Sequence, residues 1–193
     1  LGGSQIHAHG SGAVDNEVDT EPDAFETIKQ FLSYLPQNVW QVPPRIDPED
    51  PADRREESLL SVIPRDRRQM YEVREVIEAV VDRLSFFEIN PGYGEALVVG
   101  LARLDGYSVG IMANDTCHHG GAVNATASEK MMRFVDLCDT FHMPVVNLVD
   151  NPGFLIGIQA EEEGTVRLGS RALMAVYQST IPWISVIIRR CYG

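Results

Sequence analysis

The spacing of apolar residues divides this chain into helices and strands. Apolar positions three and four residues apart predict four helices, over residues 22–34, 71–84, from Thr126 onward, and 163–179. Unbroken apolar runs bounded by turn residues predict four strands, over residues 96–104, 107–113, 144–149 and 183–188. The order is a hairpin followed by alternating helices and strands, which indicates a mixed α/β fold.

Capping and turn residues support these boundaries. Thr20 precedes the first helix as an N-cap, with Pro22 in its first turn. Asp105-Gly106 separates the first two strands and is a favoured dipeptide of tight hairpin turns. Thr126 and Glu129 have the spacing of a capping box, which predicts that the next helix starts there.

The last two strands have similar surroundings. "HMPVVNLVDNPGF" and "TIPWISVIIRRCYG" each place a proline before an apolar run and a polar turn after it. A predicted helix lies between them, as in two consecutive β-α units with parallel strands. Their unbroken apolar runs predict strands that are buried on both faces of a sheet.

One stretch lacks these patterns. Residues 41–58 contain four prolines, many charges and just two large apolar residues. Such a composition is typical of a linker or an exposed excursion. We therefore place a domain boundary there, with residues 1–40 on one side and residues 59–193 on the other.

Charge and cysteine content narrow the classes of function. The 193 residues carry a net charge of −12, which lies mostly in the first 90 residues. An acidic chain repels nucleic acid and anionic membrane surfaces unless it has a local basic patch. No apolar run approaches the length of a membrane span. Three widely spaced cysteines favour a reducing compartment over a disulfide-rich secreted protein.

The polar residues leave several kinds of site chemistry open. The turn at residues 150–153 has the form of a nucleotide switch, but the chain has no glycine-rich phosphate loop ending in lysine. His7 and His9 would share one face of a strand, and with the cluster 117–119 they leave a zinc module open. No Gly-x-Ser-x-Gly elbow is present. The acidic run 161–163 is typical of the start of a helix.

Glycine-rich loops give a more specific signal. "CHHGGAVN", "DNPGFLIG" and "RRCYG" follow successive predicted strands. Glycine lets the backbone approach a ligand closely, and backbone N–H groups near helix N-termini can bind an oxyanion. The ordered set of loops therefore favours a site that stabilises negative charge on oxygen, such as the enolate of a thioester.

These residues resemble a known family, the carboxyltransferase (β) subunit of biotin-dependent acyl-CoA carboxylases of the propionyl-CoA carboxylase type. The stretches that carry the likeness occur in the family's order: "LGGSQIHAHGSGAVDN", "FLSYLP", "YEVREVIEAVVD", "FFEI", "VVGLARLDGYSVGIMAN", "ASEKMMRFVDLCDTFHMPVVNLVDNPGFLIG" and "RRCYG". They span nearly the whole chain, which resembles a central fragment of that subunit.

The resemblance implies a fold and a domain division. The fold class is α/β, crotonase-like (ClpP/crotonase) with ββα repeats. Residues 1–40 would end an N-terminal carboxyltransferase domain, residues 41–58 would be a linker, and residues 59–193 would start a C-terminal domain.

The resemblance also implies an enzyme and its partners. A carboxyl group would move from carboxybiotin, carried by a domain of a partner, to the α carbon of a short acyl-CoA such as propionyl-CoA. The fragment alone would be inactive. The implied partners are the acyl-CoA, a biotin carboxylase/biotin carrier subunit and further copies of the chain, with no metal, nucleic acid or membrane. The implied compartment is the cytoplasm, or the mitochondrial matrix in a eukaryote.

The family's motifs assign three groups of site residues. The expected oxyanion donors are Gly120, Gly121, Ala122 and Gly193. The residues expected to bind acyl-CoA are Tyr93, Asn114 and Asn124. Those expected to bind biotin are Phe154, Leu155, Ile156 and Gly157.

The chain departs from the family's motifs at a few positions. Ile156 stands where the family has a proline, Cys191 where it has an alanine, and Asn124 where it has an aspartate. Two alternatives therefore stay open beside the carboxylase. One is a biotin-dependent decarboxylase or transcarboxylase on the same fold, and the other is a non-catalytic paralogue that serves assembly.

Overall fold

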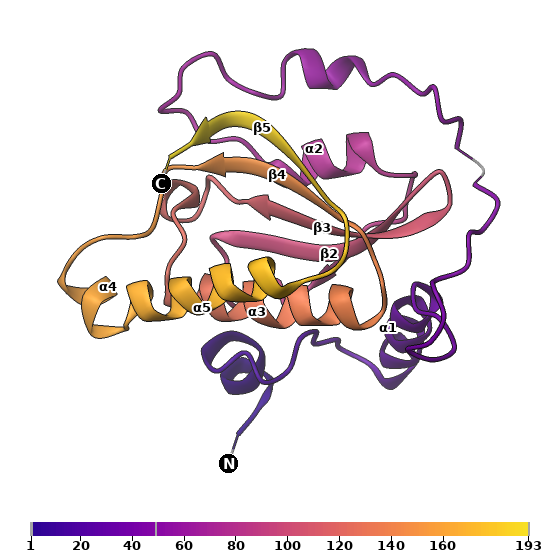
Figure 1. The fold of residues 1–193 in the computed structure, drawn as a ribbon, viewed down its shortest axis with the longest axis horizontal. Helices are drawn as coiled ribbons and strands as arrows, with labels where there is room; N and C mark the ends of the chain where they lie inside the picture. The colour runs from indigo at the N-terminus through magenta and orange to yellow at the C-terminus, as the bar shows by residue number, and fades with distance from the viewer. Residues whose placement is uncertain (1, 49, 193) are drawn as a thin grey trace.

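The computed structural model describes residues 2–48 and 50–192, and these residues build one mixed five-stranded sheet (Figure 1). The strands are Phe87–Ile89 (β1), Leu97–Leu104 (β2), Tyr107–Asn114 (β3), Val145–Asn151 (β4) and Trp183–Cys191 (β5). Their order in the sheet is β1-β2-β3-β4-β5. The first three strands pair antiparallel, while β3, β4 and β5 run parallel.

Helices cover both faces of this sheet. The helices are Glu21–Ser33 (α1), Val73–Val80 (α2), Ala125–Thr140 (α3), Ile158–Glu162 (α4) and Thr165–Gln178 (α5). Three short helical turns are Gln5–Gly10 (η1), Glu57–Leu60 (η2) and His119–Gly121 (η3). In Figure 1, α3 and α5 lie side by side along one face of the sheet, and α2 lies on the other.

The two faces of the central strands form two separate cores. On β2, Val99 belongs to the buried cluster that contains Phe134 of α3. The next residue along the strand, Val98, belongs to the cluster that contains Ile77 of α2. Successive strand residues point to opposite faces, so an unbroken apolar run fills both cores at once.

The predicted hairpin between β2 and β3 is confirmed. Asp105 and Gly106 both have positive φ, 49° and 76°, as a two-residue turn of the primed type requires. The carboxylate of Asp82 accepts hydrogen bonds from both turn amides, at 2.9 and 2.8 Å. The turn therefore forms where the Asp-Gly dipeptide predicted it.

The predicted N-cap of α1 is confirmed, but that of α3 is wrong. Thr20 accepts a hydrogen bond from the amide of Asp23 at 3.3 Å. For α3 the cap is Asn124, whose side-chain oxygen accepts from the amide of Ala127 at 2.9 Å. Thr126 therefore lies inside the first turn, because an asparagine two residues earlier makes the bond that the capping box was expected to supply.

The helix predicted over residues 163–179 is divided in two. Gly164 has a φ of 74°, a left-handed conformation that interrupts the helix between α4 and α5. The acidic run 161–163 therefore ends α4 and does not start the long helix, contrary to prediction. The helix predicted over residues 71–84 is also shorter, because α2 ends at Val80.

The N-terminal histidines do not lie on a strand. Residues Gln5–Gly10 form a π-helical turn, so His7 and His9 lie on a helix and the prediction of a shared strand face is wrong. The short strand β1 was not predicted either, since its three residues are too few to show an alternating pattern.

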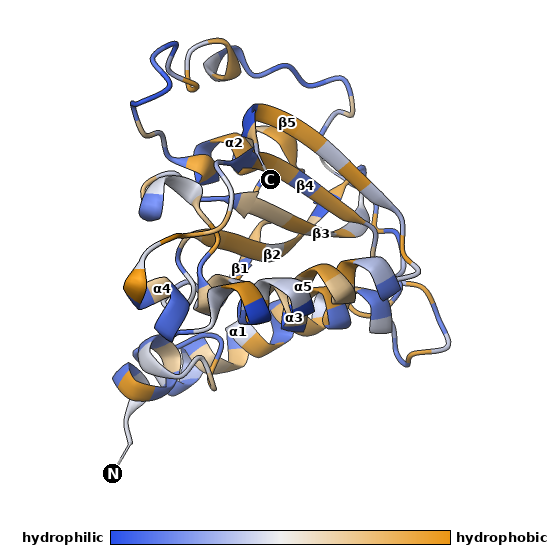
Figure 2. Ribbon diagram, turned by 60° about the vertical axis from the view of Figure 1, so that its left-hand side comes forward, coloured by the Kyte–Doolittle hydropathy of each residue, from blue (hydrophilic) through white to orange (hydrophobic). Residues whose placement is uncertain are grey.

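The parallel pairing of β4 and β5 is confirmed, but their burial differs. β4 is buried along most of its length, whereas Ile184 and Ile187 of β5 are 59% and 63% exposed. The prediction that both strands are buried on both faces is therefore wrong for β5. This strand is at the edge of the sheet, and much of it has the orange colour of hydrophobic residues in Figure 2.

The segment 41–56 contains no helix or strand among its described residues. It is attached to the rest of the chain at a few points. The guanidinium of Arg45 pairs with Asp105 at 2.9 Å, and that of Arg54 donates to the carbonyl oxygen of Val81 at 2.6 Å. The domain boundary placed in this segment stays a prediction.

Candidate active site

The candidate site begins at the loop that joins β3 to α3. Gly120 and Gly121 have φ values of 63° and 85°. A Cβ on Gly121 would lie 2.8 Å from the carbonyl oxygen of Asp150, whereas a Cβ on Gly120 would meet nothing within 4 Å. Gly121 is thus fixed against β4, and Gly120 lies beside open space.

Two of the four expected oxyanion donors, Gly121 and Ala122, already donate hydrogen bonds within this loop. The amide of Gly121 donates to the carbonyl oxygen of His118 at 2.9 Å, and the amide of Ala122 donates to that of His119 at 3.1 Å. A ligand oxygen that binds either amide therefore has to share or replace a turn hydrogen bond. The fourth expected donor, Gly193, lies outside the described residues.

Asn114 lies beneath the glycine loop. It is 5% exposed, and its side-chain NH₂ donates to the carbonyl oxygen of Gly121 at 3.0 Å. Its side-chain oxygen accepts from the backbone amide of Asp150 at 3.2 Å. Both polar atoms are thus used inside the protein, which ties the end of β3 to the loop and to β4.

Asp150, at the end of β4, holds a buried polar cluster that sequence reasoning missed. Its carboxylate is fully buried and accepts from Arg190 Nε at 2.6 Å, from Arg189 Nε at 2.9 Å and from the Tyr71 hydroxyl at 3.0 Å. Burial and the neighbouring Asp150 carboxylate raise the pKa of Tyr71. Arg190 also donates through Nη2 to the carbonyl oxygen of Gly120 at 2.7 Å.

The turn after β4 pairs with the glycine loop. Val123 donates to the carbonyl oxygen of Gly153 at 3.1 Å and accepts from the amide of Leu155 at 2.9 Å. Phe154 packs its ring against Gly169 of α5, where a Cβ would lie 2.4 Å from a ring carbon. The loop and the turn therefore meet in a two-residue parallel bridge, and α5 supports it.

A hollow of about 320 Å³, the turn hollow, opens beside that bridge. Three of the four residues expected to bind biotin line it, and the fourth, Phe154, does not. Those that contribute are Leu155, Ile156 and Gly157. His119 and Asn124 contribute from the glycine loop.

A smaller hollow of about 160 Å³, the tyrosine hollow, adjoins the turn hollow. Tyr93, His119 and Asn124 line it, so two of the three residues expected to bind acyl-CoA come together here. His119 and Asn124 line both hollows. The hydroxyl of Tyr93 donates to Glu129, and burial together with this carboxylate raises the pKa of Tyr93 to about 12.

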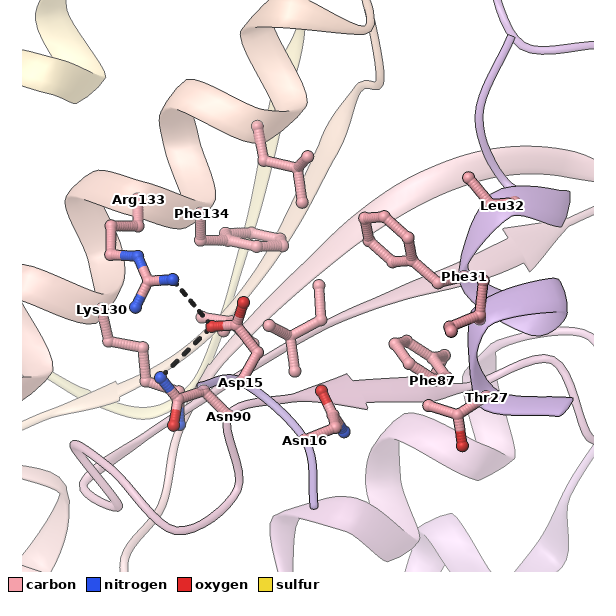
Figure 3. A pocket seen from close by; sticks show the side chains of 14 residues that line it. Asp15, Asn16, Thr27, Phe31, Leu32, Phe87, Asn90, Lys130, Arg133 and Phe134 are labelled. Atoms are coloured by element: carbon pink, nitrogen blue, oxygen red, sulfur yellow. Dashed lines mark hydrogen bonds and ion pairs between the residues drawn. The ribbon is translucent and has the colours of Figure 1, made fainter. Parts of the chain in front are cut away.

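A third pocket, the apolar pocket of about 400 Å³, was not predicted (Figure 3). It lies between α1, β1 and α3, with Phe31, Phe87 and Phe134 among its lining residues. Asp15 and Arg133 line the polar end of this pocket and form an ion pair at 3.0 Å. Lys130 is 3% exposed there, and burial lowers its pKa to about 8. The helical phase of α3, which puts residue 130 one turn from Phe134, was the signal that could have located this lysine.

The described histidines and cysteines do not form a metal centre. Within the described part of the chain, no group of three or more histidine, cysteine or acidic side chains is placed to hold a metal ion. His9 instead bonds to Glu17 at 2.7 Å, and His118 lies 3.5 Å from Glu95. Among the described helices, none has the length and apolar character of a membrane span.

Comparisons with known proteins give one family. The Carboxyl transferase domain family matches residues 1–193. The chain is 40% identical over its whole length to a propionyl-CoA carboxylase carboxyltransferase subunit of Haloferax mediterranei, of which it covers 37%. It is 38% identical over its whole length to the methylmalonyl-CoA decarboxylase subunit alpha of Veillonella parvula, of which it covers 38%. The chain thus spans little more than a third of these relatives.

Solved structures give the same result. A crystal structure of transcarboxylase 12S, described as a hexamer with methylmalonyl-coenzyme A and methylmalonic acid bound, matches the whole chain with a TM-score of 0.95 at 37% identity. This chain covers 37% of that structure. A single-chain, multi-domain long-chain acyl-CoA carboxylase matches 97% of the chain, with a TM-score of 0.85 at 33% identity, and 18% of that structure is covered. The predicted α/β crotonase-like fold is confirmed by these likenesses.

Proposed function

The chain belongs to the carboxyl transferase domain family, and on that premise we propose that it is part of a carboxyltransferase. The proposed enzyme moves a carboxyl group from carboxybiotin to the α carbon of a short acyl-CoA, such as propionyl-CoA. Two similar proteins support the substrate class, since one is a propionyl-CoA carboxylase subunit and another was crystallised with methylmalonyl-coenzyme A.

One geometric observation carries the proposal. The tyrosine hollow and the turn hollow adjoin, because His119 and Asn124 line both of them. Carboxyl transfer needs the acceptor carbon and the carboxyl donor close together, which two adjoining hollows provide. We assign the tyrosine hollow to the acyl end of acyl-CoA and the turn hollow to the biotin ring.

The glycine loop would stabilise charge on oxygen. Removing a proton from the α carbon of a thioester leaves negative charge on the thioester oxygen, and backbone N–H groups are suited to hold it. We assign this role to the amides of Gly120, Gly121 and Ala122. Asn114 is buried and bonds through both of its side-chain polar atoms to the backbone of Gly121 and Asp150, so we assign it to the support of the loop.

The turn hollow suits the head of biotin. Leu155 and Ile156 are apolar, as the thioether ring requires, while Asn124 and Gln159 offer polar groups to a ureido ring. A Cβ on Gly157 would meet nothing within 4 Å, so the backbone there is open to a ligand. When bound, carboxybiotin supplies the carboxyl group, and these residues would bind and orient its ring.

The assembly and the compartment follow from the same family. Similar proteins include a biotin-dependent acetyl-/propionyl-coenzyme A carboxylase subunit and the hexameric transcarboxylase core. We infer that this chain acts with a biotin carboxylase/biotin carrier subunit and as a homo-oligomer. The propionyl-CoA carboxylase beta chain of Mus musculus is mitochondrial. The proposed compartment is accordingly the matrix in a eukaryote and the cytoplasm otherwise.

A reaction in the opposite direction is a second candidate. It is supported by the similarity to a methylmalonyl-CoA decarboxylase subunit, at nearly the same identity as to the carboxylase subunit. The same two hollows would serve both directions, since the reverse reaction uses the same transition state. Direction would then depend on the partner that supplies or removes the carboxyl group.

The test uses the full-length gene product together with its biotin carboxylase/biotin carrier partner and ATP, which is needed to carboxylate biotin with bicarbonate. We expect labelled bicarbonate to enter propionyl-CoA, in a panel with acetyl-CoA and butyryl-CoA, and loss of carboxyl from methylmalonyl-CoA is measured in parallel. The variant Ile156→Glu places a charge in the turn hollow, at a side chain that is 89% exposed. Carboxyl transfer should fall at least about tenfold, because burying a charge against the biotin ring is costly.

The matched control is Leu60→Glu, which makes the same kind of change at an 88% exposed residue of η2. Equal rates for the two variants would exclude the turn hollow as the biotin site. A folded, carrier-bound protein that catalyses neither direction with any of these thioesters would instead support the assembly paralogue.

A further inference from the structure

Two side chains bond to the carbonyl oxygens of the glycine loop from inside the protein. Arg190 Nη2 donates to Gly120 O at 2.7 Å, and Asn114 Nδ2 donates to Gly121 O at 3.0 Å. A backbone carbonyl belongs to the same peptide unit as the N–H of the next residue. The two bonded peptide units are therefore the ones that carry the N–H groups of Gly121 and Ala122.

We propose that Arg190 and Asn114 are positioning residues that make these two amides stronger hydrogen-bond donors to a ligand oxygen, which shares or replaces their turn bonds to His118 and His119. A hydrogen bond received at the carbonyl polarises the peptide unit and strengthens the bond that its N–H donates. The Arg190 bond is charge-assisted, so its effect should be the larger one. This inference rests on the proposed function, because it assumes that the loop binds a carbonyl oxygen that gains negative charge.

The charge balance behind the loop supports the same role. Asp150 is the one carboxylate that pairs with both Arg189 and Arg190 among the described residues. The cluster therefore carries an excess positive charge where the side chains of both arginines are nearly buried, at 7% and 16% exposure. A fixed positive charge in a dry setting favours a developing oxyanion without any rearrangement during the reaction.

An irregularity in the sheet places both arginines on one carboxylate. Successive residues of a regular strand point to opposite faces, so Arg189 and Arg190 should diverge. The pairing of β4 with β5 is shifted between Val149 and Asn151, which is where Asp150 lies. Such bulges change the direction of side chains, and they are frequent next to active sites.

Arg189 provides a matched comparison within the same cluster. It pairs with the same carboxylate as Arg190, but its Nη1 donates to the carbonyl oxygen of Gln69 at 2.8 Å, away from the glycine loop. The two arginines thus share the structural role of neutralising Asp150. Contact with the loop carbonyl distinguishes Arg190.

The experiment measures the carbonyl stretching frequency of ligands bound to the full-length enzyme with its carrier partner. One sample carries ¹³C in the thioester carbonyl of propionyl-CoA, and a second carries ¹³C in the ureido carbonyl of biotin. We expect one label to shift to lower frequency on binding, which also identifies the oxygen that the loop holds. Arg190→Met should remove much of that shift and lower kcat by roughly tenfold, with a small change in KM. This loss is less than the roughly 10²–10³-fold that follows deletion of a direct donor.

Two further variants separate positioning from folding. Arg189→Met should destabilise the protein about as much as Arg190→Met and removes the same excess charge, but it keeps the bond to Gly120 O and should therefore retain more of the carbonyl shift. Arg190→Lys should restore part of the shift, since lysine keeps the charge without the two-armed geometry. If Arg190→Met does not fold, Asn114→Ser tests the second peptide unit and should give a smaller loss of the shift.

Equal carbonyl shifts in the Arg189→Met and Arg190→Met enzymes would overturn the inference. If Arg190→Met does not fold, a wild-type shift in the Asn114→Ser enzyme would overturn it instead. Absence of a shift for both labels in the unaltered enzyme has a different meaning. It would overturn the proposed oxyanion role of the loop itself.

Discussion

Two buried aspartates hold the two ends of the glycine loop, and the charges around them are balanced in opposite ways. At the start of the loop, Arg74 pairs with Asp115 at 2.8 Å, with Glu88 at 2.6 Å and with Glu72 at 3.0 Å. Three carboxylates thus share one guanidinium. At the glycine end, Asp150 alone pairs with two guanidinium groups among the described residues.

The sign of the excess charge matches the part of the loop that each cluster touches. The acidic cluster bonds to the backbone before the glycines, where Asp115 accepts from the amide of Cys117 at 2.9 Å. The basic cluster bonds to the carbonyl of Gly120. Excess negative charge beside a site for an oxyanion would oppose binding. The comparison therefore teaches that the glycine end is the end suited to an anionic oxygen.

The two clusters also differ in their contact with water. The side chain of Arg74 is about a third exposed, so solvent weakens its ion pairs. If one of its three carboxylate partners is removed, the other two still neutralise the guanidinium. Asp150 is fully buried, and its two cations depend on it. Removing the carboxylate should be far more costly at the glycine end.

The largest expected effect is that of Asp150→Asn. Breaking a buried ion pair by removing one partner typically costs about 3–5 kcal/mol, because the remaining charge is left uncompensated. Asp115→Asn should cost about 1–2 kcal/mol, because Arg74 keeps two other carboxylates. Urea denaturation of both variants at pH 7 measures the difference. Equal losses would show that the two clusters are equivalent and would break the comparison.

Gly121→Ala should have the next largest effect, with Gly120→Ala as its control. Both glycines have positive φ, which costs roughly 1–2 kcal/mol for a residue with a Cβ. At Gly121 the added Cβ would also overlap the carbonyl oxygen of Asp150, and such overpacking costs roughly 1–3 kcal/mol more. In thermal unfolding, Gly121→Ala should therefore have a lower midpoint temperature than Gly120→Ala. The reverse order would show that Asp150 does not support the loop from below.

The elements with local signals were predictable from the sequence. The β2–β3 hairpin depends on the adjacent residues Asp105 and Gly106, and α1 depends on the cap Thr20. The start of α3 was predicted two residues late, because Asn124 and Thr126 are both good capping residues and the backbone selects between them. The break at Gly164 was missed, since a single glycine within a helical pattern is often tolerated.

The exposure of β5 could not be predicted in this way. Its apolar run is like that of β4, but burial depends on the position of the strand in the sheet. The order of strands is a long-range property that periodicity does not contain. β5 has one neighbour in the described sheet, which leaves Ile184 and Ile187 at the surface.

The candidate site was predictable in parts, and its assembly was not. Glycine composition located the loop and the turn, and the family resemblance assigned ligands to them. The cluster at Asp150 joins residues 71, 150, 189 and 190, which are far apart in the sequence. His119, which lines both hollows, was weighed as a metal ligand instead. Which groups share a buried cluster follows from packing, and the sequence pattern carries no sign of it.

The smallest expected effect tests whether Lys130 compensates the excess negative charge of the acidic cluster. Burial lowers the pKa of Lys130 to about 8, although Glu88 and Asp115 act in the opposite direction. An unfolded lysine has a pKa near 10.4, so between about pH 8 and pH 10 the unfolded chain binds more protons than the folded one. Stability contributed by this residue should therefore rise with pH in that window, by about 1 kcal/mol between pH 7 and pH 9.

Lys130→Met removes this titration and keeps a side chain of similar length. The free energy of unfolding of the wild type, relative to that of Lys130→Met, should increase from pH 7 to pH 9 in urea titrations. Lys29→Met is the control, because Lys29 is on the surface of α1 and its ammonium group stays hydrated. If Lys130 were instead a working counter-ion of Glu88 and Asp115, its folded pKa would lie above the unfolded value. The wild type would then lose stability relative to Lys130→Met at pH values above about 10 and gain none between pH 7 and pH 9.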